Sequence, residues 1–416
     1  MADFNDKGTA ECVNPLPECP HKEFCGGCVY QGVPYEEQAL AKGEEVLKLM
    51  HSKGADLSKL KEPFKSEDIF RAPQIYHYRN KMEYTFGDLE KGGEMTLGMH
   101  QKKRFMSIVT VDSCQLVHED FNIILKAVLD FCIAKGYPKY NAKNHQGLMR
   151  NLIIRWGQRT GELLVNVVTS SQMEFDEEAF AAALKNVQEK LNNTIIGILH
   201  TINDRLADAV YPDEVKVLEG REYYNEEICG LKFKVSAFSF FQTNIPAVER
   251  LYMNALSLLR PEDGSGDETG YSGKTVFDLF CGTGTISQIL ALKAKKVVGI
   301  EIVEDAVESA KANAKLNGLE NCEFIAGDVF EAIDRTTEKP DVIVVDPPRM
   351  GILPKALDKI AAYGTKEILY ISCNPKTLAE NIVYLQEYYG YRARVLQAYD
   401  NFPFSKHTEC VCLLSK

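Results

Sequence analysis

The sequence contains no long hydrophobic run. A membrane-spanning helix needs about 18 or more consecutive apolar residues, and no stretch of the 416 residues approaches that length. The first residues, Met1 to Asp6, are polar and acidic and lack the basic and apolar regions of a secretory signal. Glycine and proline are not in excess, with 29 and 16 residues, and 45% of the chain is hydrophobic, which excludes a fibrous or disordered chain. We therefore expect a cytoplasmic globular protein with no membrane contact, and nothing in the sequence indicates an obligate protein partner.

Basic residues are also fewer than acidic residues. The chain has 48 Lys and Arg against 59 Asp and Glu, a net charge of −11, which argues against a broad basic surface for non-specific nucleic-acid binding. Contacts to a nucleic acid would have to be local. Residues 71–104 are suited to them, because phosphates bind cations and bases stack on aromatic rings; a solvated, charged strand pair is the alternative. This stretch holds seven basic residues against four acids, with three tyrosines interleaved: Arg71, Arg79, Lys81, Lys91, Lys102, Lys103 and Arg104, with Tyr76, Tyr78 and Tyr84.

Most of the twelve cysteines are scattered singly, but three lie within ten residues: Cys19, Cys25 and Cys28. Disulfides are rare in a reducing compartment, and three thiolates from one short loop indicate zinc or an iron–sulfur cluster. Zinc sites usually combine two C-x2-C pairs, and this region has one. The fourth ligand would be Cys12 or the distant Cys114. A chance cluster without metal is the alternative.

The chain divides into three regions. Residues 1–60 hold the cysteine cluster and a helix expected from about residue 34 to 52. Residues 61–235 are typical of short strands, with helices near 120–135 and 175–190. From 236 to 416, after a polar loop at 261–273, apolar runs alternate with amphipathic helices, which predicts a doubly wound, seven-stranded α/β domain. The seven runs are Thr275–Phe280, Lys296–Ile302, Cys322–Ile325, Asp341–Val345, Glu367–Ser372, Arg392–Ala398 and His407–Leu414.

A glycine-containing turn follows the first of these runs. Gly282 and Gly284 lie between the strand that ends at Phe280 and the next helix, where such a turn lets the backbone approach a ligand at a helix N-terminus. Glu301, at the end of the second strand, lies where an acidic residue binds ribose hydroxyls. Asp328, after the third strand, lies where a base could be recognised. Two glycines are not the full dinucleotide-binding motif, so NAD and S-adenosylmethionine both remain possible cofactors. The alternative is a tight turn that binds no ligand.

The fourth strand favours S-adenosylmethionine. It ends in Asp346-Pro347-Pro348-Arg349. In S-adenosylmethionine-dependent methyltransferases, an acidic or amide residue followed by two prolines at this place borders the methyl group and the target base. Enzymes that methylate exocyclic amines usually have an aromatic residue after the prolines, so Arg349 argues against that reaction. The alternative is that the two prolines only end the strand.

Cys373 follows the fifth strand and precedes a helix, so it lies at the crevice where α/β enzymes bind ligands. The helix N-terminus would favour its thiolate. C5 of uracil is a poor nucleophile, and addition of a cysteine to C6 makes C5 enolate-like. A base must then remove the C5 proton, and the last strand offers Glu409 and His407. The alternatives are a buried structural role for Cys373 and a structural or RNA-contacting role for His407. Cys410 and Cys412 share one strand face and are expected in the core.

Together these residues resemble the RNA (uracil-5-)-methyltransferase family, which makes 5-methyluridine in tRNA and 23S rRNA. The resemblance spans the chain from Cys19 to Glu409. It is carried by the cysteines, by Phe240-Phe241-Gln242-Thr243-Asn244, by Asp278-Leu279-Phe280-Cys281-Gly282, by Asp346-Pro347-Pro348-Arg349, by Ser372-Cys373-Asn374-Pro375 and by the closing Phe402-Pro403 to Glu409. It implies that Cys373 is the nucleophile and Glu409 the base. It further implies S-adenosylmethionine contacts from Gln242, Phe280, Glu301, Asp328 and Asp346, and a [4Fe–4S] cluster on Cys19, Cys25, Cys28 and Cys114.

Three features depart from the family pattern. The larger rRNA enzymes of the family carry an RNA-binding barrel before the cluster, and with 18 residues before Cys19 we expect that barrel to be absent. The closing motif commonly reads Phe-Pro-His-Thr-x-His-Val-Glu, whereas Phe404, Ser405 and Thr408 stand at its variable places. A net charge of −11 is also unusual for an rRNA enzyme.

The sequence also bears on the RNA substrate and on two other possible functions. By the resemblance, the cluster cysteines accompany the rRNA-modifying branches more than the bacterial tRNA branch, so 23S rRNA is the expected substrate and tRNA the alternative. A non-catalytic iron–sulfur RNA-binding protein would have lost Cys373 or Glu409, and both are present. A zinc-containing amino-methyltransferase is disfavoured by Arg349 and by the single C-x2-C pair.

Overall fold

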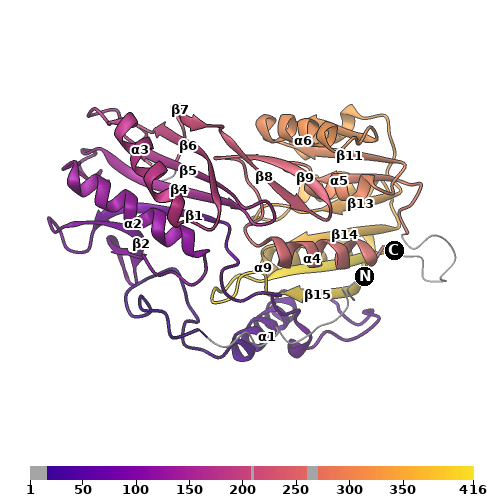
Figure 1. Cartoon of the computed structure of the whole chain (residues 1–416). Coiled ribbons are helices and arrows are strands. Elements are labelled where there is room, and N and C mark those ends of the chain that lie inside the picture. Colours follow the sequence, from indigo (N-terminus) through magenta and orange to yellow (C-terminus); the bar gives the residue numbers. More distant parts are fainter. Residues whose placement is uncertain (1–15, 208–209, 260–269) are drawn as a thin grey trace.

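Two large β-sheets stand side by side and form the two halves of the molecule (Figure 1). The computed structural model describes residues 16–207, 210–259 and 270–416. Cys12 and most of the polar loop expected at 261–273 therefore lie outside the described residues. Within them, every helix is too short or too polar to cross a membrane.

The carboxyl-terminal half is a seven-stranded sheet in the order β12-β11-β10-β13-β14-β16-β15. Its strands are β10 (Thr275–Leu279), β11 (Lys296–Glu301), β12 (Cys322–Ala326), β13 (Val342–Val345), β14 (Glu367–Ser372), β15 (Arg392–Tyr399) and β16 (Glu409–Ser415). Its helices are α4 (Ile245–Ser257), α5 (Thr285–Ala291), α6 (Glu304–Leu316), α7 (Val329–Ala332) with η3 (Ile333–Arg335), α8 (Pro354–Ala362) and α9 (Pro375–Tyr389). The seven predicted strands are confirmed. β16 alone runs antiparallel to its neighbours, because a loop without a helix joins it to β15, whereas parallel neighbours need a crossover connection.

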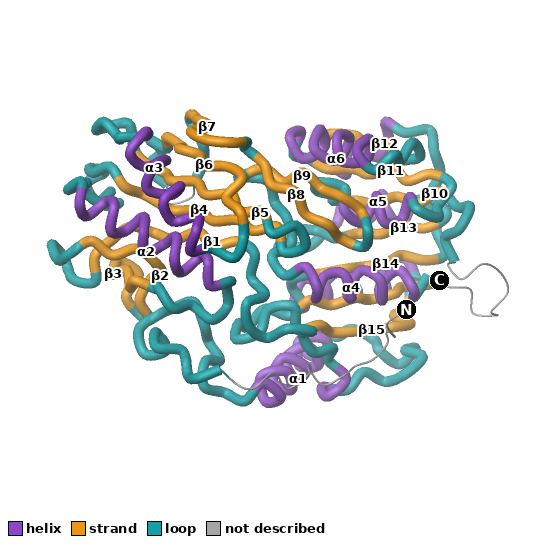
Figure 2. Tube along the Cα trace, viewed as in Figure 1, coloured by secondary structure: helices purple, strands orange, loops and turns teal. Residues whose placement is uncertain are grey.

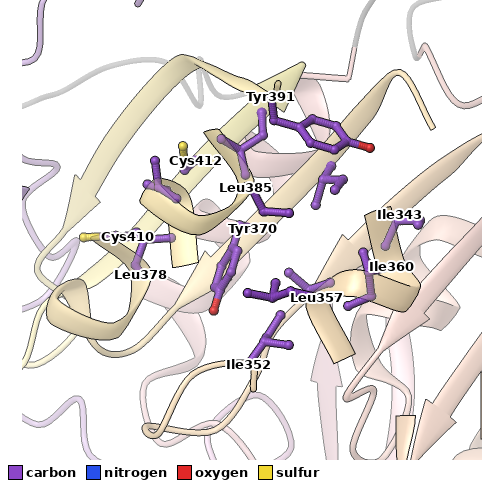
Figure 3. Close-up of a cluster of buried hydrophobic side chains, with 14 of the residues drawn as sticks. Ile343, Ile352, Leu357, Ile360, Tyr370, Leu378, Leu385, Tyr391, Cys410 and Cys412 are labelled. Carbon is purple, nitrogen blue, oxygen red and sulfur yellow. The ribbon is translucent and has the colours of Figure 1, made fainter. Parts of the chain in front are cut away.

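Helices cover both faces of this sheet. On one face Tyr370 of β14 packs with Leu378 of α9 in a buried apolar cluster (Figure 3). On the other face alternate strand residues such as Val344 pack against α4 and α5. Cys410 and Cys412 belong to the first cluster and have no exposed surface, which confirms their predicted place in the core. Because the strand order reverses between β10 and β13, the carboxyl ends of these strands border the crevice where ligands bind in such folds.

The amino-terminal segment packs against this half. Helix α1 (Tyr35–Lys53) lies against α9, and its Val46 belongs to the same buried cluster (Figure 1). Lys42 of α1 is buried and forms an ion pair with the buried Asp400 at 2.6 Å. Its ammonium also donates to the carbonyl of Phe402 at 3.0 Å. Helix α1 therefore holds the loop that joins β15 to β16. A short 3₁₀ helix, η1 (Ser66–Asp68), follows it.

Replacing Lys42 with methionine should lower the free energy of unfolding by about 3–5 kcal/mol, because the Asp400 carboxylate would stay buried without its counter-charge. Urea unfolding followed by circular dichroism measures this change. The control is Lys48→Met on the exposed side of the same helix, which should change the free energy by less than about 0.5 kcal/mol. Equal effects of the two substitutions would contradict the importance of the ion pair.

The central half is a second seven-stranded sheet, in the order β3-β2-β1-β4-β5-β6-β7. Its strands are β1 (Lys81–Asp88), β2 (Met95–Gln101), β3 (Arg104–Thr110), β4 (Met149–Gly157), β5 (Glu162–Thr169), β6 (Thr194–Ile202) and β7 (Glu214–Gly220). Helices α2 (Glu119–Ala134) and α3 (Glu177–Val187), with η2 (Gln188–Lys190), lie where the sequence predicts helices. Only β5 and β6 are parallel, and α3 joins them.

Helices α2 and α3 cover one face of the central sheet, where Tyr84 of β1 packs with Phe121 of α2. On the opposite face, Arg155 of β4 is buried and donates from Nε to the carbonyl of Ala237 at 2.8 Å. That contact ties the central sheet to the chain entering the carboxyl-terminal half. A hairpin of β8 (Tyr223–Ile228) and β9 (Leu231–Ser236) bridges the two halves (Figure 2).

Candidate active site

Cys373 lies in the turn between β14 and α9 and is partly buried. Asn374 caps α9, its Oδ1 accepting a backbone N–H of the first turn at 3.1 Å, which fixes this turn. Burial raises the pKa of Cys373 to about 11; the carboxylates of Glu409 and Asp346 add to this shift, and the Arg349 guanidinium opposes it. These effects on the pKa outweigh the stabilisation of the thiolate that is expected from the N-terminus of α9. The thiol of the free protein is therefore neutral at pH 7.

The turn after β13 is tied to the turn that carries Cys373. The carbonyl of Arg349 accepts hydrogen bonds from Asn374 Nδ2 at 2.7 Å and from Thr377 Oγ1 at 3.3 Å. The guanidinium of Arg349 lies 2.9 Å from Nδ1 of His407. Burial and this guanidinium lower the pKa of His407, so its imidazole is neutral at pH 7. The nucleophile candidate and the arginine are thus held in a fixed relation.

Glu409 opens β16 and is paired in register with Tyr399 of β15. Burial raises the pKa of Glu409 to about 7, and the Arg349 guanidinium opposes the shift. Burial and then the Glu409 carboxylate raise the pKa of Asp346 well above its usual range. Glu409 can therefore take up or release a proton near neutral pH, as a general base must.

The glycine-containing turn after β10 has an unusual backbone. Phe280, Gly282 and Gly284 have positive φ angles of 65°, 54° and 75°. A Cβ on Gly284 would lie 2.9 Å from the Phe324 ring, whereas a Cβ on Gly282 would meet nothing within 4 Å. Glu301, at the end of β11, accepts the N–H of Gly282 at 3.0 Å. The turn therefore leaves open space beside a carboxylate, which suits a nucleoside ligand.

Asp278 of β10 is predicted only as part of a motif, but its surroundings make it a further candidate. It is fully buried, and its Oδ2 accepts a hydrogen bond from Ser287 Oγ at 2.5 Å. Its Oδ1 has no hydrogen-bond partner among the described residues. Burial raises the pKa of Asp278 to about 7. A buried carboxylate oxygen without a partner is costly, and a ligand with positive charge would satisfy it.

Gln242 connects the cofactor candidates with Glu409. Its Nε2 donates to the hydroxyl of Tyr252 at 3.1 Å, and its carbonyl accepts from Asn80 Nδ2 at 3.1 Å. Burial raises the pKa of Tyr252, and the carboxylates of Asp346 and Glu409 add to the shift. Gln242 is predicted from the sequence, whereas Tyr252 and Asn80 are not.

Asp328 is the outermost of the five residues named for S-adenosylmethionine. Its side chain is exposed, and its Oδ1 accepts the N–H of Phe330 at 2.9 Å and so caps α7. The preceding Gly327 donates its N–H to the carbonyl of Glu301 at 2.8 Å. Asp328 is thus beside Glu301, at the edge of the glycine-containing turn.

The four cysteines named as cluster ligands come together from two loops. Cys19, Cys25 and Cys28 precede α1, and Cys114 follows β3. All four are free and partly exposed. Burial, and then the thiols of Cys114, Cys25 and Cys19, raise the pKa of Cys28 to about 12. Among the described residues, no three His, Cys, Asp or Glu side chains are arranged to hold a metal ion. In chemical type, however, four thiols are the donor set of a [4Fe–4S] cluster.

The cysteine loop also contacts the segment that precedes Glu409. The N–H groups of Val29 and Tyr30 donate to the carbonyl of Phe404 at 2.8 and 3.1 Å. The N–H of Phe404 donates to Gln38 Oε1 at 2.9 Å. Phe404 has a φ angle of 65°, which is strained for a bulky residue and needs such support. The amino-terminal segment therefore holds the loop that leads to Glu409.

Two of the three tyrosines expected to stack on bases are buried. Tyr78 is 1% exposed and its hydroxyl donates to the carbonyl of Pro403 at 2.9 Å, while Tyr84 is 0% exposed. The stacking prediction is wrong for both, because alternation along β1 turns Tyr84 into the core and Tyr78 supports the Phe404 loop. Tyr76 packs on Phe404, with ring centroids 5.4 Å apart.

Some basic side chains of residues 71–104 contact other parts of the protein. Arg71 pairs with Glu36 at 2.9 Å. Lys102 donates to the carbonyl of Lys22 at 2.6 Å, which ties the β2–β3 turn to the cysteine loop. The side chains of Lys91, Lys103 and Arg104 are exposed, as is that of Lys102.

Comparisons with known proteins agree with the predicted family. A family model described as tRNA (uracil-5-)-methyltransferase matches residues 45–416. An RNA methyltransferase of Clostridium acetobutylicum is 48% identical over 400 residues, covering 96% of this chain and 84% of that protein. One of Clostridium tetani is 47% identical over 406 residues, covering 96% of this chain and 85% of that protein.

A solved structure supports the fold. The tRNA (uracil-54, C5)-methyltransferase of Pyrococcus abyssi, in complex with S-adenosyl-L-homocysteine, matches with a TM-score of 0.74 at 24% identity, covering 94% of this chain and 86% of that chain. The family resemblance expected from the sequence is confirmed by the match over residues 45–416. The chain belongs to the tRNA (uracil-5-)-methyltransferase family and is an S-adenosylmethionine-dependent RNA (uracil-5-)-methyltransferase.

Proposed function

We propose that the enzyme methylates C5 of a specific uridine in 23S rRNA through a covalent bond between Cys373 and C6 of the base. The observation that carries the proposal is the meeting of Cys373, Arg349 and Glu409 where β13 and β14 end and β16 begins. A nucleophile and a carboxylate whose pKa is about 7 are the two groups that the reaction needs in one place.

The Cys373 thiol gives its proton to solvent water, and the resulting thiolate adds to C6 of the uracil. The S–C6 bond forms, and the electrons of the C5–C6 double bond move toward O4, so that C5 becomes nucleophilic. When bound, S-adenosylmethionine would supply an electrophilic methyl group on a sulfonium. C5 would take up this methyl as the methyl–sulfur bond breaks, with S-adenosylhomocysteine as the leaving group. Glu409 then removes the C5 proton. The C5–H electron pair restores the double bond, the S–C6 bond breaks, and Cys373 leaves as a thiolate.

The carboxylates beside Cys373 add to the effect of burial, which is the main reason that its thiol stays protonated in the free enzyme. Asp346 and Glu409 help to raise the pKa of the thiol to about 11. A cationic ligand beside these carboxylates would offset their effect and favour the thiolate. We therefore propose that Cys373 becomes reactive only when the site is loaded.

Decay of a preformed protein–RNA adduct should accelerate as the pH rises toward 7 and level off above it. Glu409 accepts the C5 proton only when ionised, and burial raises its pKa to about 7. Below that pH the rate should fall about tenfold per pH unit. Rapid-quench measurements at constant ionic strength give the profile. A flat profile between about pH 5 and 8 would remove Glu409 from this step.

Six residues are proposed to hold S-adenosylmethionine. The turn at Phe280 to Gly284 gives the backbone space, and Glu301 and Asp328 lie beside it. The Asp346 carboxylate helps to raise the pKa of Cys373, and Gln242 contacts Tyr252, whose pKa the same carboxylate helps to raise. Asp278, with its unpartnered Oδ1, offers a buried carboxylate to a positively charged group.

A [4Fe–4S] cluster is proposed on the four neighbouring thiols of the amino-terminal loop and the loop after β3. Its support is the donor set, four thiols with their mutual electrostatic effect. When bound, the cluster would cross-link these two loops. Because Val29 and Tyr30 hold Phe404, the cross-link would also stabilise the loop that leads to Glu409.

Anaerobically purified protein should be brown, with broad absorption near about 400 nm. Cys25→Ser or Cys114→Ser should lose iron and thermal stability, because each removes one of the thiols proposed as ligands. Cys12→Ser is the control and should keep both. Iron analysis and thermal melting are the measurements. A colourless protein with stoichiometric zinc would contradict the iron–sulfur assignment, and loss of metal from the control would move the fourth ligand from Cys114 to Cys12.

The choice of 23S rRNA is supported by the cysteine cluster, which in the resembling family accompanies rRNA-modifying members. The second candidate is tRNA, which the matching family description names. Mass mapping of 5-methyluridine in both RNAs, from a strain that lacks the gene, separates them. Loss of one rRNA 5-methyluridine is the expected result; loss from tRNA alone would overturn the rRNA assignment.

A further inference from the structure

The central sheet carries a groove that the catalytic site does not use. It has a volume of about 660 Å³ and is lined by β1, β2, β3, the start of β4 and residues 139–143. We name it the β1–β3 groove. β3 is the edge strand of the central sheet and lies far from the sheet of β10 to β16 (Figure 2). The groove is therefore separate from the crevice that holds Cys373.

Charge in the groove opposes the charge of the whole chain. Its lining includes four cationic side chains and two carboxylates, a surplus of two positive charges in a protein of net charge −11. The six residues are Lys91, Lys139, Lys143 and Arg150, with Glu83 and Asp88. A local cationic surplus in an acidic protein favours a polyanionic ligand at this place.

Two of the four cationic side chains contact other groups in the wall of the groove. Lys139 pairs with Asp88. Arg150 is buried, donates to the carbonyl of Asn203 at 3.0 Å and lies 4.1 Å from the centre of the Tyr140 ring. These contacts neutralise Asp88 and fix one side of the groove.

The other two cations remain available to a ligand. Lys91 and Lys143 are exposed, and neither ammonium has an ion-pair partner among the residues that the structure describes. They lie in two different segments that border the same groove. Two unpaired ammonium groups facing one groove suit successive phosphates of a nucleic-acid strand.

An aromatic platform lies on the same groove. Phe105 of β3 is 64% exposed, and its ring is stacked on His100 at a centroid distance of 4.3 Å with planes inclined by 8°. His100 Nδ1 also lies 2.6 Å from the carbonyl of Phe105. One face of the Phe105 ring is thus supported by His100, and the high exposure leaves ring surface on which a base can stack.

The path from the active site to the groove follows β1. Asn80, immediately before β1, donates its N–H to the carbonyl of Thr243 at 3.0 Å and its Nδ2 to the carbonyl of Gln242 at 3.1 Å. From there the eight residues of β1 extend roughly 26 Å, and the groove begins at Glu83 and reaches Asp88. A strand of RNA that leaves the active site along β1 would reach the groove.

We propose that the β1–β3 groove binds a single-stranded segment of the RNA substrate that flanks the target uridine, with phosphates on Lys91 and Lys143 and a base on Phe105. The proposal rests on the proposed function, since it assumes that the enzyme binds a structured RNA. An RNA occupant is favoured over an acidic protein because β1 runs from Asn80, which contacts Gln242 and Thr243, to the groove.

The test compares Lys91→Glu/Lys143→Glu with a matched control, Lys126→Glu/Lys190→Glu. The control has the same change of charge, at exposed lysines of α2 and η2 outside the groove. Methylation kinetics are measured with in vitro transcribed 23S rRNA and tRNA, and RNA affinity is measured as a function of salt. S-adenosylmethionine binding, measured by calorimetry, reports the integrity of the catalytic half.

The groove variant should raise the KM for its RNA at least about tenfold and reduce the slope of log affinity against log salt by about 1.5, the contribution of two phosphate contacts. Its kcat and its S-adenosylmethionine affinity should stay within about twofold of wild type, as should every value for the control. Phe105→Ala should weaken RNA binding roughly 5- to 150-fold without changing the salt slope.

Two different outcomes would overturn two different claims. If wild type methylates neither transcript, the proposed function fails. If wild type is active and the groove variant matches the control in KM and salt slope, the groove does not bind RNA and its occupant is another polyanion, such as an acidic protein.

Discussion

Cys373→Ala should abolish methylation of RNA while S-adenosylmethionine still binds. Without the thiol, C6 receives no nucleophile, and C5 keeps the poor reactivity of free uracil. Loss of a covalent nucleophile lowers the rate by at least about 1,000-fold. The side chain lies in a turn fixed by Asn374 and Thr377 through the carbonyl of Arg349, so the substitution should leave the fold unchanged.

Two measurements check this result. Transfer of radiolabelled methyl to the RNA gives the rate, and calorimetry gives the affinity for S-adenosylmethionine, which should stay within about threefold of wild type. Cys410→Ala is the matched control for a nearby buried cysteine, and it should retain methyl transfer. Activity of Cys373→Ala comparable to that of the control would contradict a covalent mechanism.

Glu409→Gln should stop the reaction after methyl transfer and before release. Glutamine keeps the size of the side chain but cannot accept the C5 proton, so the double bond cannot re-form and the S–C6 bond cannot break. Release should slow by about 100- to 10,000-fold. A complex of protein and RNA that already carries the methyl group should therefore accumulate, and it should appear as a labelled, slowly migrating band on a denaturing gel.

His407→Gln is the control for this experiment. His407 faces the guanidinium of Arg349 at 2.9 Å, and burial lowers its pKa, so it is a poor candidate for the base. Its substitution should not trap the adduct. A trapped band with His407→Gln and normal turnover with Glu409→Gln would show that His407, and not Glu409, removes the C5 proton. Loss of both activity and adduct in Glu409→Gln would mean that Glu409 acts before methyl transfer.

Much of the catalytic fold could be predicted from the sequence because its strands are buried on both faces. Such strands appear as short, nearly continuous apolar runs, and the run Glu367–Ser372 coincides with β14. The direction of β16 could not be predicted in this way, because an apolar run has no direction. It depends on the loop from β15, whose backbone at Phe404 is held by Val29 and Tyr30 from the far end of the chain.

The candidate site was predictable where residues follow strands directly. Carboxyl ends of parallel strands share one edge of a sheet, so the sequence places Asp346 and Cys373, which each follow such a strand, at the same edge. Tyr252 and Asn80 were not, because they reach Gln242 from a helix and from the central half. No local pattern marks such contacts between distant segments.

The central half was the least predictable. The tyrosines of residues 71–104 form a pattern that suits RNA binding, yet Tyr78 and Tyr84 are buried. Alternation along β1 places Tyr84 in the core, and the sequence does not say which face of a strand a helix will cover. Phe105, an exposed aromatic residue of the same sheet, does not stand out in the sequence, because its stacking on His100 depends on the pairing of β2 with β3.

Mass spectrometry of the Glu409→Gln protein after reaction with its RNA and methyl donor tests the covalent mechanism most directly. After digestion with protease and nuclease, the account predicts a peptide containing Cys373 that carries one 5-methylated uridine nucleotide on its sulfur. The same digest without methyl donor should contain no methylated adduct. A free Cys373 thiol together with released 5-methyluridine in the RNA would contradict the account, because methyl transfer would then have been completed without a persistent bond to the enzyme.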